Sequence, residues 1–203
     1  MASDVVHVVD DDVDVRKSLG FLLATADFAV RLHESATAFL ATEPKEIDGC
    51  IVTDVRMPGI DGMEFLRQLR AGGHRVPVIV MTGHADVALA VQAMKEGAAD
   101  FIEKPFDDQV LIDAIHSALA NRNQAAAAHP QSAEIRKHLS TLSERERQVL
   151  EGLVSGLPNK TIAYDLGISP RTVEIHRANV MSKMRAGSLS HLVRMALIVD
   201  LKA

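Results

Sequence analysis

The 203-residue sequence predicts an α/β domain followed by an all-α domain. Two observations carry this prediction. Short apolar runs alternate with segments of helical periodicity over residues 1–122, and only helical periodicity follows after residue 140. Strict alternation of strands and helices produces a parallel sheet with right-handed crossovers, so we expect a doubly wound (βα)5 domain. Of the common strand orders for such a sheet, we expect 2-1-3-4-5. The predicted domains are residues 1–122 and 140–203, joined by a linker at 123–139.

The composition indicates a folded chain without membrane segments. Hydrophobic residues make up 47% and charged residues 24%, which predicts a packed core. No apolar run approaches the roughly 18 residues that a membrane helix needs, and the N-terminus lacks the order of a signal peptide. The single cysteine, Cys50, excludes an internal disulfide and fits a reducing compartment. We therefore expect a cytoplasmic protein in which Cys50 is a core residue.

The charge is distributed unequally along the chain. The formal net charge is −5, but residues 1–122 hold 11 Lys and Arg against 20 Asp and Glu, whereas residues 123–203 hold 11 against 7. An acidic first part and a basic second part predict two domains with different partners. Nucleic acid is a candidate partner for the second.

The elements of the first domain are short apolar runs and helical repeats bounded by turn residues. Gly72-Gly73 and Gly97 are typical helix-stop signals. The predicted strands cover residues 5–9, 28–32, 50–52 leading into Asp54, 77–81 and 100–103. The predicted helices follow them, with apolar positions in residues 15–26, 36–40, 63–69, 87–94 and 110–119.

Polar residues follow four of these strands at their carboxyl ends. They are Asp10, Asp11, Asp12, Asp54, Thr82 and Lys104. The carboxyl ends of parallel strands meet at one edge of the sheet, so these side chains should converge. Crowded carboxylates repel one another unless a cation lies among them, and a site of oxygen ligands favours Mg²⁺. A lysine and a hydroxyl beside a metal-bound aspartate could hold a phosphoryl group, which predicts phosphorylation of a carboxylate.

Several of these residues also have simpler interpretations. An acidic N-terminal cluster by itself is usually a solvated loop, and only the combination with Asp54, Thr82 and Lys104 favours metal binding. His7 and His33 are most simply core or sheet-edge residues. His84 could tune dephosphorylation or could be a plain surface histidine.

Four motifs in this order resemble the receiver domain of two-component response regulators over about residues 1–122. They are VVDDD, TDVRMPGIDG, VMTGH and FIEKPF. The resemblance implies that Asp54 is the phosphoacceptor and that Asp10, Asp11, Asp54 and the backbone carbonyl of Arg56 organise Mg²⁺. It also implies that Thr82 and Lys104 contact the phosphoryl group and that Phe101 is a switch residue. The Lys104-Pro105 bond permits the cis form that family members use.

The second domain is predicted to be a helix-turn-helix. Ser143 and Glu146 form a capping-box pattern, and Gly156 ends that helix. Asn159 is expected to cap a short helix, a turn follows at residues 167–169, and Ser169 with Pro170 begins a third helix. A last helix is predicted over residues 189–201. The linker at 123–139 begins with an alanine run that could extend the preceding helix until Pro130.

The third helix divides into two faces at 100° per residue. Val173, Val180 and Met184 fall on the inward face. Arg171, Ile175, Ala178 and Asn179 fall opposite, together with Ser182. An arginine, an amide and small or apolar side chains can read base edges in the major groove. The basic residues Lys160, Arg177, Lys183 and Arg185 are better suited to phosphate contacts.

Residues 140–203 closely resemble the LuxR-type helix-turn-helix, and the whole architecture resembles the NarL/FixJ group of response regulators. The DNA-binding residues that we expect are Lys160, Arg171, Thr172, Ile175, Ala178, Asn179 and Lys183. The resemblance implies a transcriptional activator of nitrogen-fixation-type genes that phosphorylation converts to a homodimer. The implied partners are a sensor histidine kinase of the FixL type, promoter DNA and RNA polymerase.

Two other function classes stay open on the sequence alone. Aspartyl phosphatases of the haloacid dehalogenase type also use an aspartate, Mg²⁺ and a lysine, but they need a second acid two residues after the nucleophile, where this chain has Arg56. We therefore expect phosphoryl acceptance and slow self-hydrolysis, not enzymatic turnover. A pseudo-receiver that controls DNA binding without phosphate is the third possibility, and phosphodonor treatment separates it from the first.

Overall fold

The computed structural model describes residues 4–42, 47–83, 87–122 and 128–201. Its contacts divide the chain into two compact units, residues 1–85 with 96–124 and residues 86–95 with 125–203. Residues 86–95 are thus grouped with the second unit although we predicted them in the first domain, and the predicted limits at 122 and 140 stay predictions. Over the described ranges, no helix has the length and hydropathy needed to cross a membrane.

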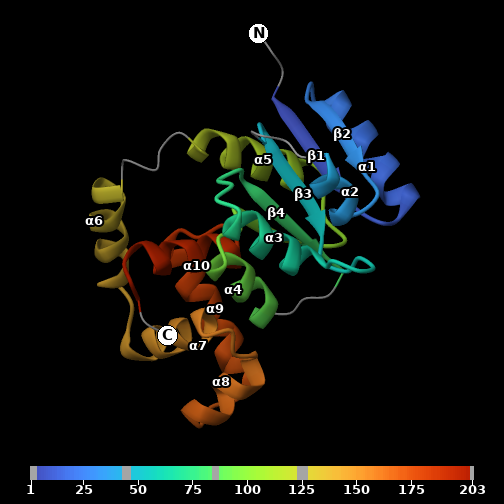
Figure 1. The fold of residues 1–203 in the computed structure, drawn as a ribbon. Coiled ribbons are helices and arrows are strands. Elements are labelled where there is room, and N and C mark those ends of the chain that lie inside the picture. Colours follow the sequence, from blue (N-terminus) through green and yellow to red (C-terminus); the bar gives the residue numbers. More distant parts are fainter. Residues whose placement is uncertain (1–3, 43–46, 84–86, 123–127, 202–203) are drawn as a thin grey trace. The chain divides into compact units, whose positions relative to one another are not determined.

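The first unit contains a parallel five-stranded sheet in the predicted order, β2-β1-β3-β4-β5. This confirms the predicted fold class. Figure 1 labels β1 to β4 of this sheet. The strands are β1 (Val5–Val9), β2 (Ala29–His33), β3 (Cys50–Asp54), β4 (Val78–Thr82) and β5 (Asp100–Glu103). The helices that alternate with them are α1 (Val13–Thr25), α2 (Ala36–Ala41), α3 (Gly62–Ala71), α4 (Val87–Lys95) and α5 (Asp108–Arg122).

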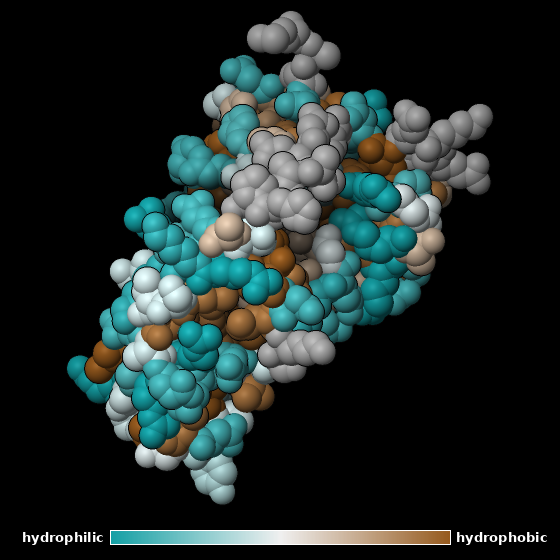
Figure 2. All heavy atoms as spheres, turned by 90° about the vertical axis from the view of Figure 1, so that its left-hand side faces the viewer, coloured by the Kyte–Doolittle hydropathy of each residue, from teal (hydrophilic) through white to brown (hydrophobic). Residues whose placement is uncertain are grey.

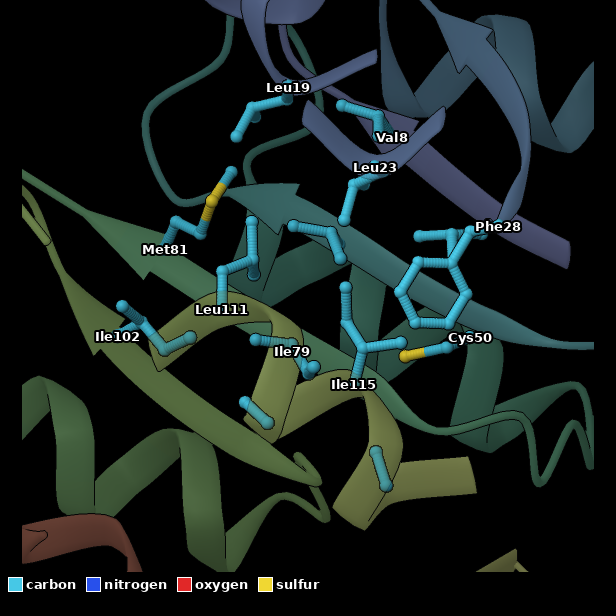
Figure 3. Packing of buried hydrophobic residues seen from close by; sticks show 14 of the residues in the cluster. Val8, Leu19, Leu23, Phe28, Cys50, Ile79, Met81, Ile102, Leu111 and Ile115 are labelled. Carbon is cyan, nitrogen blue, oxygen red and sulfur yellow. The ribbon is translucent and has the colours of Figure 1, made fainter. Parts of the chain in front are cut away.

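One face of the sheet packs against α1 and α5. Figure 3 shows Leu19 and Leu23 of α1, and Leu111 and Ile115 of α5, among the buried side chains of the strands. The strand side chains in this cluster include Val8, Cys50, Ile79 and Met81. Because β3 and β4 are covered and almost completely buried, their apolar runs do not alternate with polar residues. Cys50 lies in this core, as predicted.

The other face of the sheet carries a cluster of aromatic rings at β1 and β2. The rings of His7 and His33 stack, with Nδ1 of His7 3.1 Å from Nε2 of His33. Phe39 of α2 contacts both rings and also meets Phe65 of α3 edge-on. Both histidines are therefore packing residues of the sheet, as predicted.

This histidine pair predicts a dependence of stability on pH. Burial, followed by the charges of His7 and Arg31, lowers the pKa of His33 to about 4. Burial and the charge of Arg31 also lower the pKa of His7. The unfolded chain binds these protons near pH 6.5 and the folded chain does not, so stability is complete above pH 6.5 and is lost as the pH falls toward 4. For His33 alone we expect a loss of roughly 1–2 kcal/mol between pH 7 and pH 5.

Urea unfolding of the full chain at pH 7 and pH 5 measures this loss, with His33→Gln as the matched variant. The glutamine can still hydrogen-bond His7 but does not titrate. We expect the variant to lose much less stability between the two pH values than the wild type. Equal losses in both proteins would contradict the assignment to His33.

The second unit contains the predicted all-α domain. Its helices after residue 125 are α6 (Ala128–Leu139), α7 (Glu144–Val154), α8 (Asn159–Leu166), α9 (Pro170–Met184) and α10 (Leu189–Ile198). Helix α9 contacts each of the other four. The predicted linker therefore contains a helix, and Pro130 lies in its first turn, where a missing N–H does not cost a helical hydrogen bond.

The helix ends of this unit agree with all but one of the predicted caps. Ser143 and Glu146 form the expected capping box, and the Ser169 side chain accepts from the Thr172 N–H at 3.1 Å. Gly167 ends α8 in the left-handed conformation at φ 65°, which makes the turn into α9. The prediction for Asn159 was wrong, because Pro158 is the N-cap of α8 and provides no side-chain hydrogen bond.

The surface combines charged and polar residues with scattered apolar ones. On the face shown in Figure 2, hydrophilic residues predominate and hydrophobic residues lie between them. Two of the most exposed large apolar or aromatic side chains in the described chain belong to the helix-turn-helix. They are Tyr164 of α8, 87% exposed, and Ile175 of α9, 57% exposed.

Candidate functional site

Three of the predicted site residues meet at the carboxyl edge of the sheet. Asp10 follows β1, Asp54 ends β3 and Lys104 follows β5. The Lys104 ammonium donates to Oδ1 of Asp54 at 2.6 Å and to Oδ2 of Asp10 at 3.2 Å. The fold thus brings together side chains that are 50 and 94 residues apart in sequence from Lys104.

The electrostatics of this group depend on burial. Asp10 is only 2% exposed, and burial raises its pKa, an effect that the Asp12 N–H and Lys104 offset in part. Burial alone would lower the pKa of Lys104, but the hydrogen bonds and charges of Asp54 and Asp10 outweigh it and raise that pKa. One ammonium therefore balances two carboxylates in a poorly hydrated site, which leaves an excess negative charge.

The acidic residues in the loop after β1 have different environments. Asp12 is the N-cap of α1, and its carboxylate accepts from the N–H groups of Asp14 and Val15, which lowers its pKa. Asp11 is exposed to solvent. Arg16, which the sequence analysis did not select, donates to the Asp10 carbonyl at 2.6 Å and holds the loop against α1.

The loop between β3 and α3 fixes the backbone around Asp54. The Arg56 N–H donates to the second carboxylate oxygen of Asp54, and the Gly62 N–H donates to the Val55 carbonyl at 2.9 Å. A Cβ atom on Gly62 would lie 2.2 Å from the Asp54 carbonyl oxygen. Only a glycine fits this close approach, so Gly62, the first residue of α3, also positions Asp54.

The remaining predicted residues lie on β4 and β5. Thr82 is 1% exposed at the end of β4, and its carbonyl accepts from the Lys104 N–H at 2.7 Å. Phe101 lies on β5 beside Val80 and is partly exposed. The Lys104-Pro105 peptide bond is cis. His84 lies outside the described residues.

The oxygen atoms at this edge fit a divalent cation such as Mg²⁺. Asp10 and Asp54 provide carboxylate oxygens with an excess negative charge, and no sulfur or imidazole ligand adjoins them in the described site. Within the described ranges, no three His, Cys, Asp or Glu side chains form a ready-made metal cluster. Lys104 bridges the two aspartates instead, so a bound cation would have to compete with its ammonium.

Helix α9 presents the predicted face to solvent. Val173, Val180 and Met184 are buried, as the helical periodicity predicts. The residues expected at DNA that are exposed are Arg171, Ile175, Ala178, Asn179 and Lys183 on α9 and Lys160 on α8. Ile175 is the largest apolar side chain among these exposed residues.

Two residues of this predicted DNA surface are engaged inside the domain. The Thr172 hydroxyl lies 2.8 Å from the Ser169 hydroxyl at the start of α9. The Lys183 ammonium donates to Oε2 of Glu146 on α7 at 2.6 Å. Sequence reasoning assigned Glu146 only to the capping box and missed its bond to Lys183.

Comparison with protein families gives two matches, one to the α/β part of the chain and one to the all-α part. Residues 6–116 match the response regulator receiver domain, and residues 140–196 match the bacterial regulatory proteins of the luxR family. The first match alone spans more than half of the chain. The chain belongs to the two-component response regulators.

Similar response regulators include FixJ proteins along most of the chain. The transcriptional regulatory protein FixJ of Azorhizobium caulinodans is 60% identical over 193 residues, which cover 95% of this chain and 92% of that protein. FixJ of Rhizobium meliloti is 58% identical over 197 residues and is covered to 97%, as is this chain. This response regulator is thus a FixJ-like, DNA-binding protein with a receiver and a LuxR-type helix-turn-helix.

Solved structures agree with this assignment. Full-length FixJ from B. japonicum matches with a TM-score of 0.59 at 49% identity, and the match covers 100% of both chains. The structure of FixJ-N matches with a TM-score of 0.56 at 53% identity and covers 59% of this response regulator and 96% of that chain.

Proposed function

We propose that this response regulator is switched by phosphorylation of Asp54. The observation that supports the proposal is the pair of contacts from the Lys104 ammonium to Asp54 and Asp10. A cation that touches both the acceptor carboxylate and its acidic neighbour can neutralise oxygens that gather negative charge during phosphoryl transfer.

Mg²⁺ is the proposed cofactor. Asp10, Asp11, Asp54 and the backbone carbonyl of Arg56 would hold it. When bound, the ion supplies positive charge to the phosphoryl oxygens.

The donor is a phosphohistidine of a sensor histidine kinase, by resemblance of the FixL type. One carboxylate oxygen of Asp54 attacks phosphorus, the P–N bond to histidine breaks as the P–O bond forms, and the histidine ring nitrogen keeps the electron pair. Lys104 and the Thr82 hydroxyl then bind oxygens of the acyl phosphate. Slow self-hydrolysis follows when water attacks phosphorus: the bond from phosphorus to the Asp54 oxygen breaks, inorganic phosphate leaves and the carboxylate is restored. No enzymatic activity is proposed.

Phosphorylation is proposed to change the receiver through Thr82 and Phe101. Thr82 moves toward the phosphoryl group, Phe101 turns inward, and the changed receiver then supports a homodimer. Dimerisation places two copies of α9 about one DNA turn apart, which matches a two-half-site operator.

We infer that the dimer activates transcription in the cytoplasm, with promoter DNA and RNA polymerase as partners. The similarity to FixJ proteins supports targets of the nitrogen-fixation type.

Light scattering and DNA footprinting of the full chain, each with and without acetyl phosphate and Mg²⁺, test this function. We expect phosphodonor to raise the dimer fraction and to strengthen protection of the promoter fragment. A phosphorylated protein that stays monomeric and binds with unchanged affinity would contradict the proposed switch.

Lys104→Met is expected to slow formation of the acyl phosphate by about a hundredfold or more, because loss of one charge-stabilising donor typically costs this much. Incorporation of labelled phosphate from acetyl phosphate measures the rate. Lys17→Met, at an exposed position on α1, is the matched control and should react as the wild type does. Equal rates in all three proteins would remove Lys104 from the site.

A further inference from the structure

The ion pair between Glu146 and Lys183 joins two helices of the DNA-binding domain, α7 and α9. Glu146 belongs to the first turn of α7, and Lys183 belongs to the last turn of α9. The distance of 2.6 Å is that of a strong charge-assisted hydrogen bond. The Glu146 side chain is 5% exposed and that of Lys183 is 40% exposed, so the carboxylate end of the pair is shielded from water.

Glu146 makes a second bond with the same oxygen. Its Oε2 also accepts from the Ser143 N–H at 2.7 Å, which is one half of the capping box. The hydrogen bond from Lys183 and then that from Ser143 hold the pKa of Glu146 at about 2. The carboxylate is thus charged at every physiological pH.

Lys183 lies at the margin of the face that reads DNA. At 100° per residue it is about 80° round α9 from Ile175, between the exposed face and the buried one. Its ammonium is drawn inward by Glu146 and not outward toward a phosphate. A lysine that is bound in this way has lost the freedom that lets an unpaired lysine neutralise DNA.

Lys183 lies near the C-terminal end of α9, so a small tilt of the helix about this end moves its N-terminal turn by a large distance. Lys183 follows Arg171 by 12 residues, which corresponds to about 18 Å along the helix axis. A tilt of about 10° about the Lys183 end would move the N-terminal turn of α9 by about 3 Å, far more than a base-edge hydrogen bond tolerates. The buried apolar residues of α9 hold it in place without directional preference, whereas the ion pair fixes a direction.

We propose that Glu146 is a positioning residue for DNA recognition. It holds Lys183 and so fixes the last turn of α9 on the first turn of α7, and Lys183 acts as an anchor instead of a phosphate contact. The proposal rests on α9 being the helix that reads DNA.

Glu146→Gln is the sharpest variant, because glutamine keeps the capping box but loses the charge that holds Lys183. We expect affinity for the footprinted promoter fragment to fall about tenfold, while affinity for a random-sequence duplex stays within about twofold. A merely structural role would lower both affinities together or neither, and either result would overturn the proposal.

The salt dependence of binding tests the role of Lys183 directly. Lys160→Met removes an exposed lysine and should reduce the slope of log affinity against log salt by about 0.9 per subunit. Lys183→Met should leave this slope unchanged but lower the ratio of promoter to random-sequence affinity as Glu146→Gln does. A reduction of the slope equal to that of Lys160→Met would show that Lys183 contacts phosphate and would refute the inference.

One further variant, Lys183→Arg, keeps the test decisive if Glu146→Gln fails to fold. Lys183→Arg retains the charge pair and should retain the affinity ratio, whereas an equal loss in Lys183→Arg and Lys183→Met counts against positioning. The double variant Glu146→Gln/Lys183→Met should be no worse than Lys183→Met alone, and additive losses also count against it. If Lys160→Met leaves the slope unchanged, the proposed DNA contact at α8 fails, which is a different outcome from failure of the ion pair.

Discussion

Asp54→Asn is expected to abolish the response to phosphodonor. The asparagine carbonyl can still accept from Lys104, but an amide cannot form an acyl phosphate. Coupling between two sites typically changes affinity by about 5- to 150-fold. In Asp54→Asn, treatment with phosphodonor should leave the affinity for the operator unchanged, which is a factor of one. Light scattering and footprinting with and without acetyl phosphate measure the change, and the affinity of the untreated protein should stay close to that of the wild type.

The matched control is Asp61→Asn in the same loop. Asp61 is exposed and caps α3 by accepting from the Glu64 N–H at 2.7 Å, a role that asparagine fills equally well. This variant should keep the full response to phosphodonor. If Asp54→Asn still dimerises on treatment, the switch does not run through Asp54.

Gly62→Ala should misplace the phosphoacceptor. The added Cβ atom would lie 2.2 Å from the Asp54 carbonyl oxygen and 3.0 Å from the Asp54 carbonyl carbon. The backbone at Gly62 or at Asp54 must therefore move. Overpacking of this kind costs about 1–3 kcal/mol, and a displacement near 1 Å at a reacting group can slow a reaction about a hundredfold. We expect both a lower urea midpoint and a much slower uptake of phosphate from acetyl phosphate.

Gly187→Ala separates the local effect from a general effect of losing a glycine. Gly187 has no atom within 4 Å of its added Cβ and does not have a positive φ. It should react with acetyl phosphate at the wild-type rate. A normal rate in Gly62→Ala as well would mean that the close approach to Asp54 is unimportant for the chemistry.

The sequence predicts well which side chains meet at the carboxyl edge of the sheet, because this depends only on the order and direction of the strands. Parallel strands end at one edge, so Asp10, Asp54 and Lys104 could be placed together from strand order alone. The inward face of α9 is equally predictable, because helical periodicity fixes which positions meet the core.

The features that escaped prediction depend on contacts between distant segments. Gly62 carries the signal of an ordinary turn, and its close approach to Asp54 follows only from the path of the loop. Glu146 was fully explained by the capping box, so nothing local indicated its bond to Lys183, 37 residues away. The wrong cap at Asn159 has a local cause, since Pro158 already has the extended conformation that an N-cap requires.

The central claim is that Asp54 accepts a phosphoryl group in a site completed by a divalent cation. Peptide mapping by mass spectrometry, after treatment of the full chain with acetyl phosphate with and without Mg²⁺, tests this claim most directly. The account predicts one acid-stable, base-labile phosphoryl group on the peptide that contains Asp54, formed only with Mg²⁺. A phosphoryl group on another residue, or none on Asp54 in the presence of Mg²⁺, would contradict it.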